Sequence, residues 1–260
     1  MTIAAARLVV GAIGLVAIST FKGRWHNLIA LWRSPLIWAM GAGVAGYQAL
    51  FFIGTGLTGV AIGTLASLAL GPLMAGLLSW AITRHAPSGQ WWRSTSLAIV
   101  GLGVLSYGGL TGDTTINVLG VLAAMGAGGA YAIYTVLGAR LATSEMPATD
   151  VLAASFALGG IALIPFGFST VSALSSTNGL LLVLWLGVIA TTFAYVMFGM
   201  GIAALDAGTV ATLNLAEPVI AAILGVVIVG ESLSTLSIAG STLIALSLFL
   251  LARATMKGAS

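Results

Sequence analysis

Apolar runs of about 20 residues recur along the whole chain, separated by short polar stretches. Each run is long enough for an α-helix to cross a hydrocarbon core roughly 30 Å thick. Only 6% of the residues are charged and 59% are hydrophobic, whereas a soluble domain carries about 25% charged residues. The alternation of apolar and polar residues that a membrane β-barrel needs is not found. The sequence therefore predicts an all-α polytopic membrane protein.

The apolar runs predict nine membrane-spanning helices joined by short loops. In chain order, the expected spans cover residues 3–20, 35–55, 58–82, 94–110, 116–140, 149–169, 179–204, 207–229 and 235–253.

Lys and Arg residues gather in alternate loops and in the C-terminal tail, whereas the opposite loops carry Asp113 and Glu231 and no Lys or Arg. Positively charged loops stay on the cytoplasmic side of a membrane. We therefore expect a cytoplasmic C-terminus, with Met1 on the outer side. The expected location is a bacterial plasma (inner) membrane, with the lipid bilayer as the surrounding medium.

Motifs for catalysis, metal binding and phosphate binding are missing from the sequence. It has no cysteine, and its two histidines, His26 and His85, both lie beside basic residues without metal-ligand spacing. A phosphate-binding loop, a serine nucleophile elbow and an HExxH motif are also absent. The net charge of +3 arises from loop residues that set membrane orientation, so it does not indicate nucleic-acid binding. We expect no enzyme, no cofactor and no metal.

An internal repeat relates residues 51–68 to residues 196–213 at a constant shift of 145. Five spans separate equivalent helices, so the two copies have opposite orientations in the membrane. Inverted repeats of this kind are typical of secondary transporters. The matching residues are Gly54 and Gly199, Gly56 and Gly201, Gly63 and Gly208, Thr64 and Thr209, Ala66 and Ala211, Leu68 and Leu213, and, one residue further on, Pro72 and Pro218.

The repeat implies a plan of five plus five helices. The first four predicted spans match the last four, so the partner of the fifth span would precede residue 1. We therefore expect an inverted 5 + 5 repeat from which the first helix is absent. Residues 1–112 form the first repeat with four helices, and residues 113–260 form the second with five.

Glu217 and Pro218 stand side by side near the middle of the eighth predicted span. A charged side chain at that depth costs about 2.5–3.5 kcal/mol on insertion scales, so Glu217 should face a cavity or a partner. Pro218 removes a backbone donor and is expected to break the helix, as is Pro72 in the other repeat. Paired interruptions in two halves indicate a transporter's central site. The alternative is a protonated Glu217 that ties two helices together.

Other polar side chains within predicted spans are further candidates for substrate binding, each with a structural alternative. Asn214 precedes Pro218 by one turn, where it could bind substrate or satisfy the broken backbone. Arg7 could pair with an acidic group of a substrate or extend to the interface. The tyrosines could line a cavity or only join neighbouring helices. The remaining candidates are Tyr47, Gln48, Tyr131, Tyr134 and Tyr195.

The stretches AAARLVVGAIGL, GTLASLALGPLMAGLLSW and AGTVATLNLAEPVIAAILGVVIVGESLSTLSIAGSTLIALSLFLLA resemble EamA-domain proteins of the drug/metabolite transporter superfamily. The resemblance covers nearly the whole chain and begins at the family's second helix. It implies ten helices in two inverted repeats around a central cavity. By helix location it adds Tyr47, Tyr195, Asn214 and Glu217 to that cavity. The first repeat departs from the family pattern, since Arg84-His85 replaces the Gly-Glu of residues 230–231.

The sequence and the resemblance together predict a secondary transporter. The expected activity is export or exchange of small organic metabolites, such as amino acids, by alternating access around a central cavity. Protons are a candidate coupling ion, with Glu217 as the group that binds them. The alternative is a membrane scaffold or sensor that transports nothing.

Overall fold

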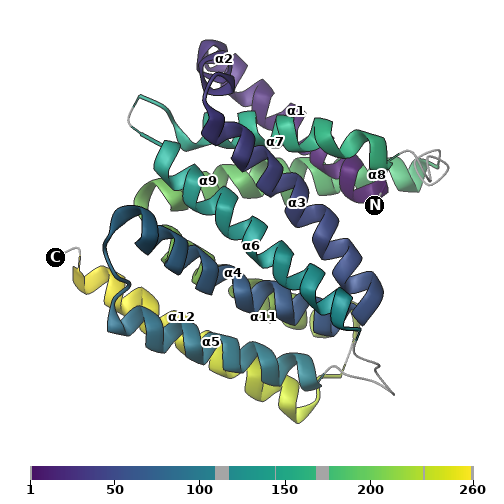
Figure 1. The fold of residues 1–260 in the computed structure, drawn as a ribbon. Coiled ribbons are helices and arrows are strands. Elements are labelled where there is room, and N and C mark those ends of the chain that lie inside the picture. The colour runs from purple at the N-terminus through teal and green to yellow at the C-terminus, as the bar shows by residue number, and fades with distance from the viewer. Residues whose placement is uncertain (1, 109–116, 144, 168–175, 231, 259–260) are drawn as a thin grey trace. The chain divides into compact units, whose positions relative to one another are not determined.

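The computed structural model describes residues 2–108, 117–143, 145–167, 176–230 and 232–258. Every described regular element is a helix (Figure 1). In chain order, the elements are α1 (Thr2–Phe21), α2 (Trp25–Trp32), α3 (Pro35–Thr58), α4 (Val60–Thr83), α5 (Gly89–Gly108), α6 (Val118–Leu141), α7 (Ala148–Gly167), α8 (Thr177–Gly187), the π-helix η2 (Val188–Phe193), α9 (Ala194–Ala204), α10 (Ala207–Leu213), α11 (Ala216–Leu224), the π-helix η3 (Gly225–Val229) and α12 (Thr235–Gly258).

Helices occur at all nine predicted positions. Within the described ranges, eight helical segments are long and apolar enough to cross a membrane by length and composition. The helix at the fourth position, α5, is not among them, and its first residues, GQWWRSTS, contribute Gln, Arg and hydroxyl side chains that lower its mean hydropathy. The chain is an all-α polytopic membrane protein, and the expected count of nine is approximate. Parts of the expected ends, at 109–110, 116 and 168–169, lie outside the described residues, as do Asp113 and Glu231.

The first basic loop contains a short helix that the sequence did not predict. Gly23 has a φ of 71°, and its N–H donates to the Thr20 carbonyl over 2.9 Å. The N–H of Arg24 donates to the Ser19 carbonyl, also over 2.9 Å. A glycine with positive φ after the last turn is a common helix ending. It ends α1 and lets the chain turn into α2.

The helices form two compact units. Unit 1 comprises residues 1–49 and 133–206, and unit 2 comprises residues 50–132 and 207–260. Helices α3 and α6 are each divided between the two units, after residue 49 and after residue 132 respectively. Each unit thus combines segments from both halves of the sequence, while the 1–112 and 113–260 repeats remain a prediction about sequence similarity.

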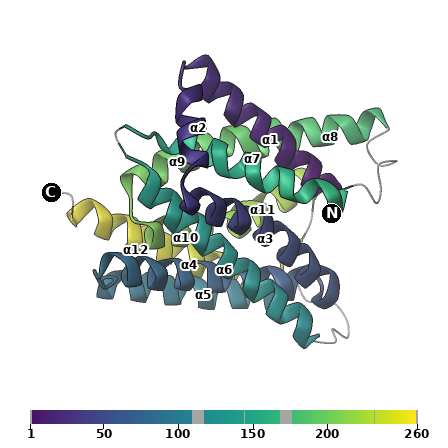
Figure 2. The same ribbon diagram turned by 45° about the horizontal axis from the view of Figure 1, so that its top comes forward.

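Unit 1 is organised around α1 and α7, which lie side by side in both ribbon views (Figures 1 and 2). Helix α1 also contacts α8 and η2. A methyl group at Gly11 or Gly14 would overlap Thr191 or Thr192 of η2. Small residues allow membrane helices to approach closely, so these two glycines set the distance between α1 and the π-helix.

Unit 2 is organised around α5 and α12, which pack along each other. A Cβ atom at Gly101 would lie 2.9 Å from the Gly240 carbonyl oxygen, so the two backbones meet directly. Ala98, Leu102, Leu215 and Ile244 form a fully buried core beside this contact. Helix α4 packs against both α5 and α10.

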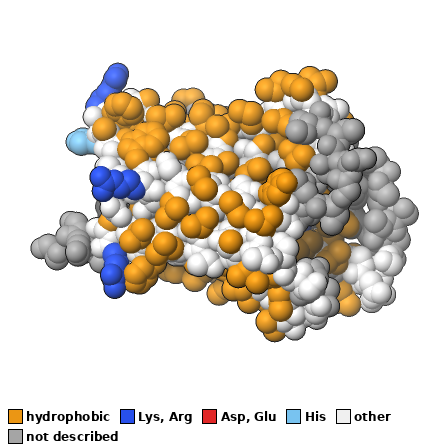
Figure 3. All heavy atoms as spheres, turned by 90° about the horizontal axis from the view of Figure 1, so that it is seen from below, with side chains coloured by type: hydrophobic (Ala, Val, Ile, Leu, Met, Phe, Trp, Pro, Cys, Tyr) orange, Lys and Arg blue, Asp and Glu red, His pale blue; other side chains and the backbone are white. Residues whose placement is uncertain are grey.

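The surface over α5 and α12 suits a lipid environment. Figure 3 views this side and shows apolar side chains along the helices, with Lys and Arg side chains gathered at one end. Such a distribution agrees with helices that cross the hydrocarbon core and place their basic residues at one interface.

Candidate functional site

Three of the predicted site residues meet in unit 1. The hydroxyl groups of Tyr134 in α6 and Tyr195 in α9 lie 3.2 Å apart, at hydrogen-bonding distance. The Tyr47 ring, from α3, meets the Tyr134 ring edge-on, with centroids 6.4 Å apart and planes at 74°. The sequence named each of these tyrosines as a separate candidate, and their contact depends on how three distant segments pack.

Two phenylalanines complete this group, and the sequence analysis missed both. Phe156 of α7 lies 4.3 Å from the Tyr195 ring, and Phe198 of α9 lies 5.4 Å from it, centroid to centroid. We call Tyr47, Tyr134, Phe156, Tyr195 and Phe198 the aromatic cluster. Phenylalanine has no polar atom, so polar side chains within the spans do not indicate either residue, although Phe198 shares a helix face with Tyr195 at a spacing of three.

The aromatic cluster is partly accessible. Tyr134 and Phe156 are buried, whereas Tyr47, Tyr195 and Phe198 are half-buried. Aromatic faces attract cations such as ammonium groups, and a phenol hydroxyl can donate or accept a hydrogen bond. The cluster therefore combines ring faces and hydroxyl groups, which are suited to contacts with cationic and polar groups respectively.

A second pair of predicted residues meets in unit 2. The side-chain amide of Asn214 donates a hydrogen bond of 2.5 Å to the Tyr131 hydroxyl. The Tyr131 ring lies against Gly71 of α4, where a Cβ atom would be 3.2 Å from its Cδ1. The absence of a side chain at Gly71 thus leaves room for the ring.

The helix containing Glu217 is interrupted, as predicted. Helix α10 ends at Leu213 and α11 begins at Ala216. The N–H of Glu217 donates to the Asn214 carbonyl over 3.0 Å, so the carbonyl that Pro218 leaves without its usual donor is satisfied. Pro218 occupies the first turn of α11, where its missing N–H is not needed. Glu217 is exposed, in the same first turn, where the helix dipole favours a negative charge.

The expected break at Pro72 is wrong for this structure, because α4 runs through this residue without interruption. A proline ring normally clashes with the side chain of the residue before it. Here that residue is Gly71, which has no Cβ atom, and both residues are buried within α4. The two repeated prolines therefore have different structural effects.

Gln48 and Arg7 lie outside both groups. Gln48 is buried in unit 1, and helix geometry turns it about 100° away from Tyr47. Arg7 is half-buried on α1, and its carbonyl oxygen lies 3.2 Å from the position of a Cβ atom at Gly187. Their roles in substrate binding remain predictions.

Asp150 is the centre of a buried polar cluster that the sequence analysis missed. Its carboxylate is 0% exposed and accepts hydrogen bonds from Ser19 Oγ (2.7 Å) and Asn27 Nδ2 (2.8 Å). Arg24 Nε lies 3.0 Å from Asp150 Oδ2. These residues, which we call the Asp150 cluster, join the end of α1, the helix α2 and the start of α7. The sequence did offer a signal for this cluster, because Asp150 is one of the 6 Asp and Glu residues of the chain and lies at the start of a span.

Comparisons with known proteins identify the family. The EamA-like transporter family matches residues 118–253, just over half of the chain. The uncharacterized transporter YwfM of Bacillus subtilis is 34% identical over 253 residues, which are 96% of this chain and 83% of that protein. The threonine/homoserine exporter RhtA of Salmonella typhimurium is 29% identical over 238 residues, covering 91% and 76% of the two chains. The chain belongs to the EamA-like transporter family, within the drug/metabolite transporter superfamily.

A solved structure supports the fold. A protein crystal structure superposes with a TM-score of 0.79 at 22% sequence identity, covering 100% of this chain and 89% of its own. Family membership makes the chain an integral membrane transporter rather than an enzyme. Within the described residues, no group of three or more His, Asp or Glu residues could hold a metal ion.

Proposed function

We propose that the chain exports or exchanges small organic metabolites, amino acids or related compounds among them, by alternating access. The aromatic cluster of unit 1 carries this proposal, because hydroxyl groups and accessible ring faces inside apolar helices can select a polar solute. The name of the relative RhtA, a threonine/homoserine exporter, supports the amino-acid class.

The chemistry of the aromatic cluster suits a zwitterion. Its aromatic faces can hold the ammonium group, and its hydroxyls can donate to a carboxylate. The hydrogen-bonded pair of Asn214 and Tyr131 in unit 2 is a separate candidate for contact with a polar solute.

Alternating access is supported by the inverted repeat in the sequence and by interruptions inside the spans. The chain departs from regular α-helix at η2, at η3 and between α10 and α11. Transporter sites commonly lie at discontinuous helices, and π-helical turns are frequent at functional sites. Tyr195 is the second residue after η2, which associates one of these interruptions with the aromatic cluster.

Glu217 is the proposed proton-coupling group. It is exposed, at the start of α11, within a segment apolar enough to span the membrane. We expect Glu217→Gln to abolish the pH dependence of transport in reconstituted vesicles, because glutamine cannot take up a proton. Asp206→Asn, at an exposed acid just before α10, is the matched control. An unchanged pH profile for Glu217→Gln would remove its coupling role.

We further propose a bacterial plasma-membrane location with the C-terminus in the cytoplasm, from the distribution of Lys and Arg between the loops. Export is then tested in intact cells. Cells that express the chain should release amino acids, or resist their toxic analogues, more than cells with an empty vector. Equal release and equal resistance across the panel, together with tight binding of a partner protein, would favour the scaffold or sensor alternative.

A further inference from the structure

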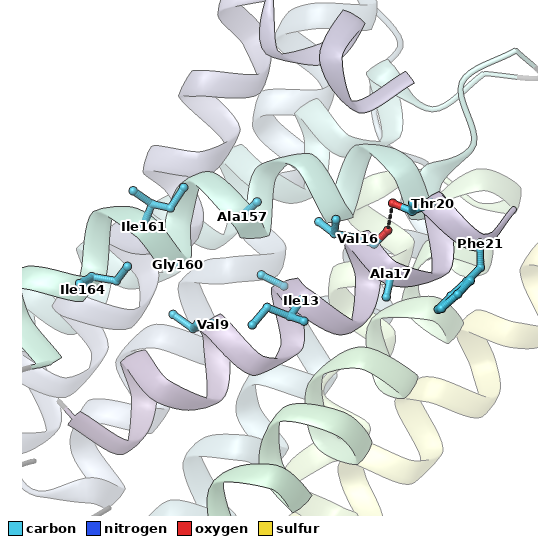
Figure 4. Close-up of a pocket in the computed structure, with 11 residues that line it drawn as sticks. Val9, Ile13, Val16, Ala17, Thr20, Phe21, Ala157, Gly160, Ile161 and Ile164 are labelled. Carbon is cyan, nitrogen blue, oxygen red and sulfur yellow. Dashed lines mark hydrogen bonds between the residues drawn. The ribbon is translucent and has the colours of Figure 1, made fainter. Parts of the chain in front are cut away.

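An apolar groove of about 480 Å³ runs between α1 and α7 in unit 1 (Figure 4). Its lining includes Val9, Ile13 and Phe21 of α1 and Gly160, Ile161 and Ile164 of α7. Large hydrophobic side chains stay exposed along it, with Phe21 at 91%, Ile13 at 63% and Ile161 at 58%. The groove is separate from the aromatic cluster and from the Asp150 cluster, because it shares no lining residue with either.

The groove presents almost pure hydrocarbon. Thr20 is the hydroxyl residue in its lining, and its Oγ1 donates to the Val16 carbonyl over 2.8 Å (Figure 4). That hydroxyl is therefore satisfied within α1 itself. Both helices are candidate membrane spans, so the groove meets the acyl chains of the bilayer rather than water.

The length of the groove fits one leaflet. Along α1 its lining extends from Val9 to Phe21, which corresponds to about 18 Å of helix at 1.5 Å per residue. Half of a hydrocarbon core is about 15 Å thick. One acyl chain that enters from an interface could therefore lie along the whole groove.

Basic residues follow directly at one end of the groove. It reaches Thr20 and Phe21, after which the chain continues as Lys22-Gly23-Arg24. Lys22 is exposed, while Arg24 is 26% exposed and lies against Asp150. Basic segments next to membrane helices attract anionic lipid head groups. An apolar groove followed by basic residues is complementary to an anionic phospholipid, which has an apolar tail followed by a negative head group.

We infer that this groove is a binding site for one anionic phospholipid, with an acyl chain between α1 and α7 and its phosphate at the Lys22 loop. This site concerns the protein's lipid environment and lies outside the proposed transport pathway. Its test measures lipid binding alone, so the result does not depend on whether the chain transports amino acids.

The test is native mass spectrometry of the full chain in detergent, titrated with phosphatidylglycerol or phosphatidylcholine carrying the same acyl chains. We expect one phosphatidylglycerol to bind roughly fivefold more tightly than phosphatidylcholine, since one basic residue near a lipid surface contributes about that factor. Lys22→Gln should remove this preference. The matched control Arg93→Gln, at an exposed arginine of α5, should retain it.

A second variant tests the groove itself. A Cβ atom at Gly160 would lie 3.6 Å from Val9 Cγ2, which is ordinary contact, so the backbone accepts a side chain here and Gly160→Leu adds one to the lining of the groove. We expect it to abolish the one-to-one binding of both lipids. Gly103→Leu adds the same side chain to α5, where a Cβ atom meets nothing within 4 Å, and should bind lipid as the wild type does.

Several results would overturn the inference. Equal affinity of the wild type for the two lipids would exclude head-group recognition. Unchanged binding by Gly160→Leu, with an unchanged circular dichroism spectrum, would exclude the groove. If Gly160→Leu instead converts a dimer into a monomer, the groove is an interface between two copies of the chain. Should Gly160→Leu fail to fold, the wild-type comparison and Lys22→Gln still test whether the site prefers an anionic head group at the Lys22 loop.

Discussion

At the scale of single residues, the pairing of Tyr134 with Tyr195 shows what the sequence could and could not predict. Both tyrosines could be named as candidates, because each is a polar group within an apolar span. Their contact could not be predicted, since 61 positions separate them and only the packing of α6 against α9 joins their hydroxyls. Phe156 and Phe198 carry no polar atom, so nothing in their own chemistry distinguished them from core residues.

The hydroxyl pair predicts the effect of Tyr195→Phe. This change keeps the ring but removes one side of the 3.2 Å contact. We expect a loss of about 0.5–1.5 kcal/mol in the free energy of unfolding, the net worth of one hydrogen bond. If the hydroxyl also binds substrate, KM should rise roughly fivefold. Tyr107→Phe, at an exposed tyrosine of α5, is the control, and equal KM values for both variants would argue against substrate contact.

The Asp150 cluster predicts a larger loss of stability. Asp150→Asn keeps the shape of the side chain but leaves Arg24 without its carboxylate partner. Breaking a buried ion pair costs about 3–5 kcal/mol, and the partial exposure of Arg24 places the expected value at the lower end. The midpoint of thermal unfolding in detergent should fall by on the order of 5–10 °C.

The control for Asp150→Asn is Glu145→Gln, at an exposed position. Exposed substitutions of this kind change stability by less than about 0.5 kcal/mol. Equal midpoints for the two variants would show that the buried carboxylate contributes little to the fold.

At the scale of helices, the positions of the elements followed from hydrophobic runs, whereas their interior irregularities did not. The π-helix η2 depends on two threonines, whose hydroxyls donate to carbonyls five residues earlier, Thr191 to Leu186 and Thr192 to Gly187. The Thr192 hydroxyl is also 3.2 Å from the Gly11 carbonyl of α1. Such a turn depends on a neighbouring helix, so the residues of one span cannot predict it.

The two repeated prolines predict different responses to alanine. Pro72 is inside α4 and removes one backbone hydrogen bond there, whereas Pro218 is in the first turn of α11. Proline costs about 3 kcal/mol relative to alanine in a helix interior and little at a helix start. We expect Pro72→Ala to stabilise the protein by about 1–2 kcal/mol after the lost ring packing is subtracted, and to slow amide hydrogen exchange in α4. Pro218→Ala should change neither quantity, and equal responses would contradict the different roles of the two prolines.

At the scale of the whole molecule, the distribution of charge in the sequence predicts the orientation of the chain in the membrane. The packing of the helices gives no information about this orientation. The absence of cysteine makes this prediction simple to measure with single-cysteine variants. We expect His85→Cys, in a basic loop, to react with an impermeant maleimide only after the cells are opened. Thr177→Cys, at the exposed start of α8, should react in intact cells. The reverse pattern would contradict a cytoplasmic C-terminus.

We propose that this EamA-like protein moves amino acids or related metabolites, and flux through reconstituted vesicles tests this proposal most directly. Vesicles loaded with unlabelled threonine should take up labelled threonine faster than protein-free vesicles. This uptake should saturate, and Tyr195→Phe should weaken it. If labelled threonine, homoserine and the wider amino-acid panel all enter no faster than they enter protein-free vesicles, the proposed substrate class is wrong.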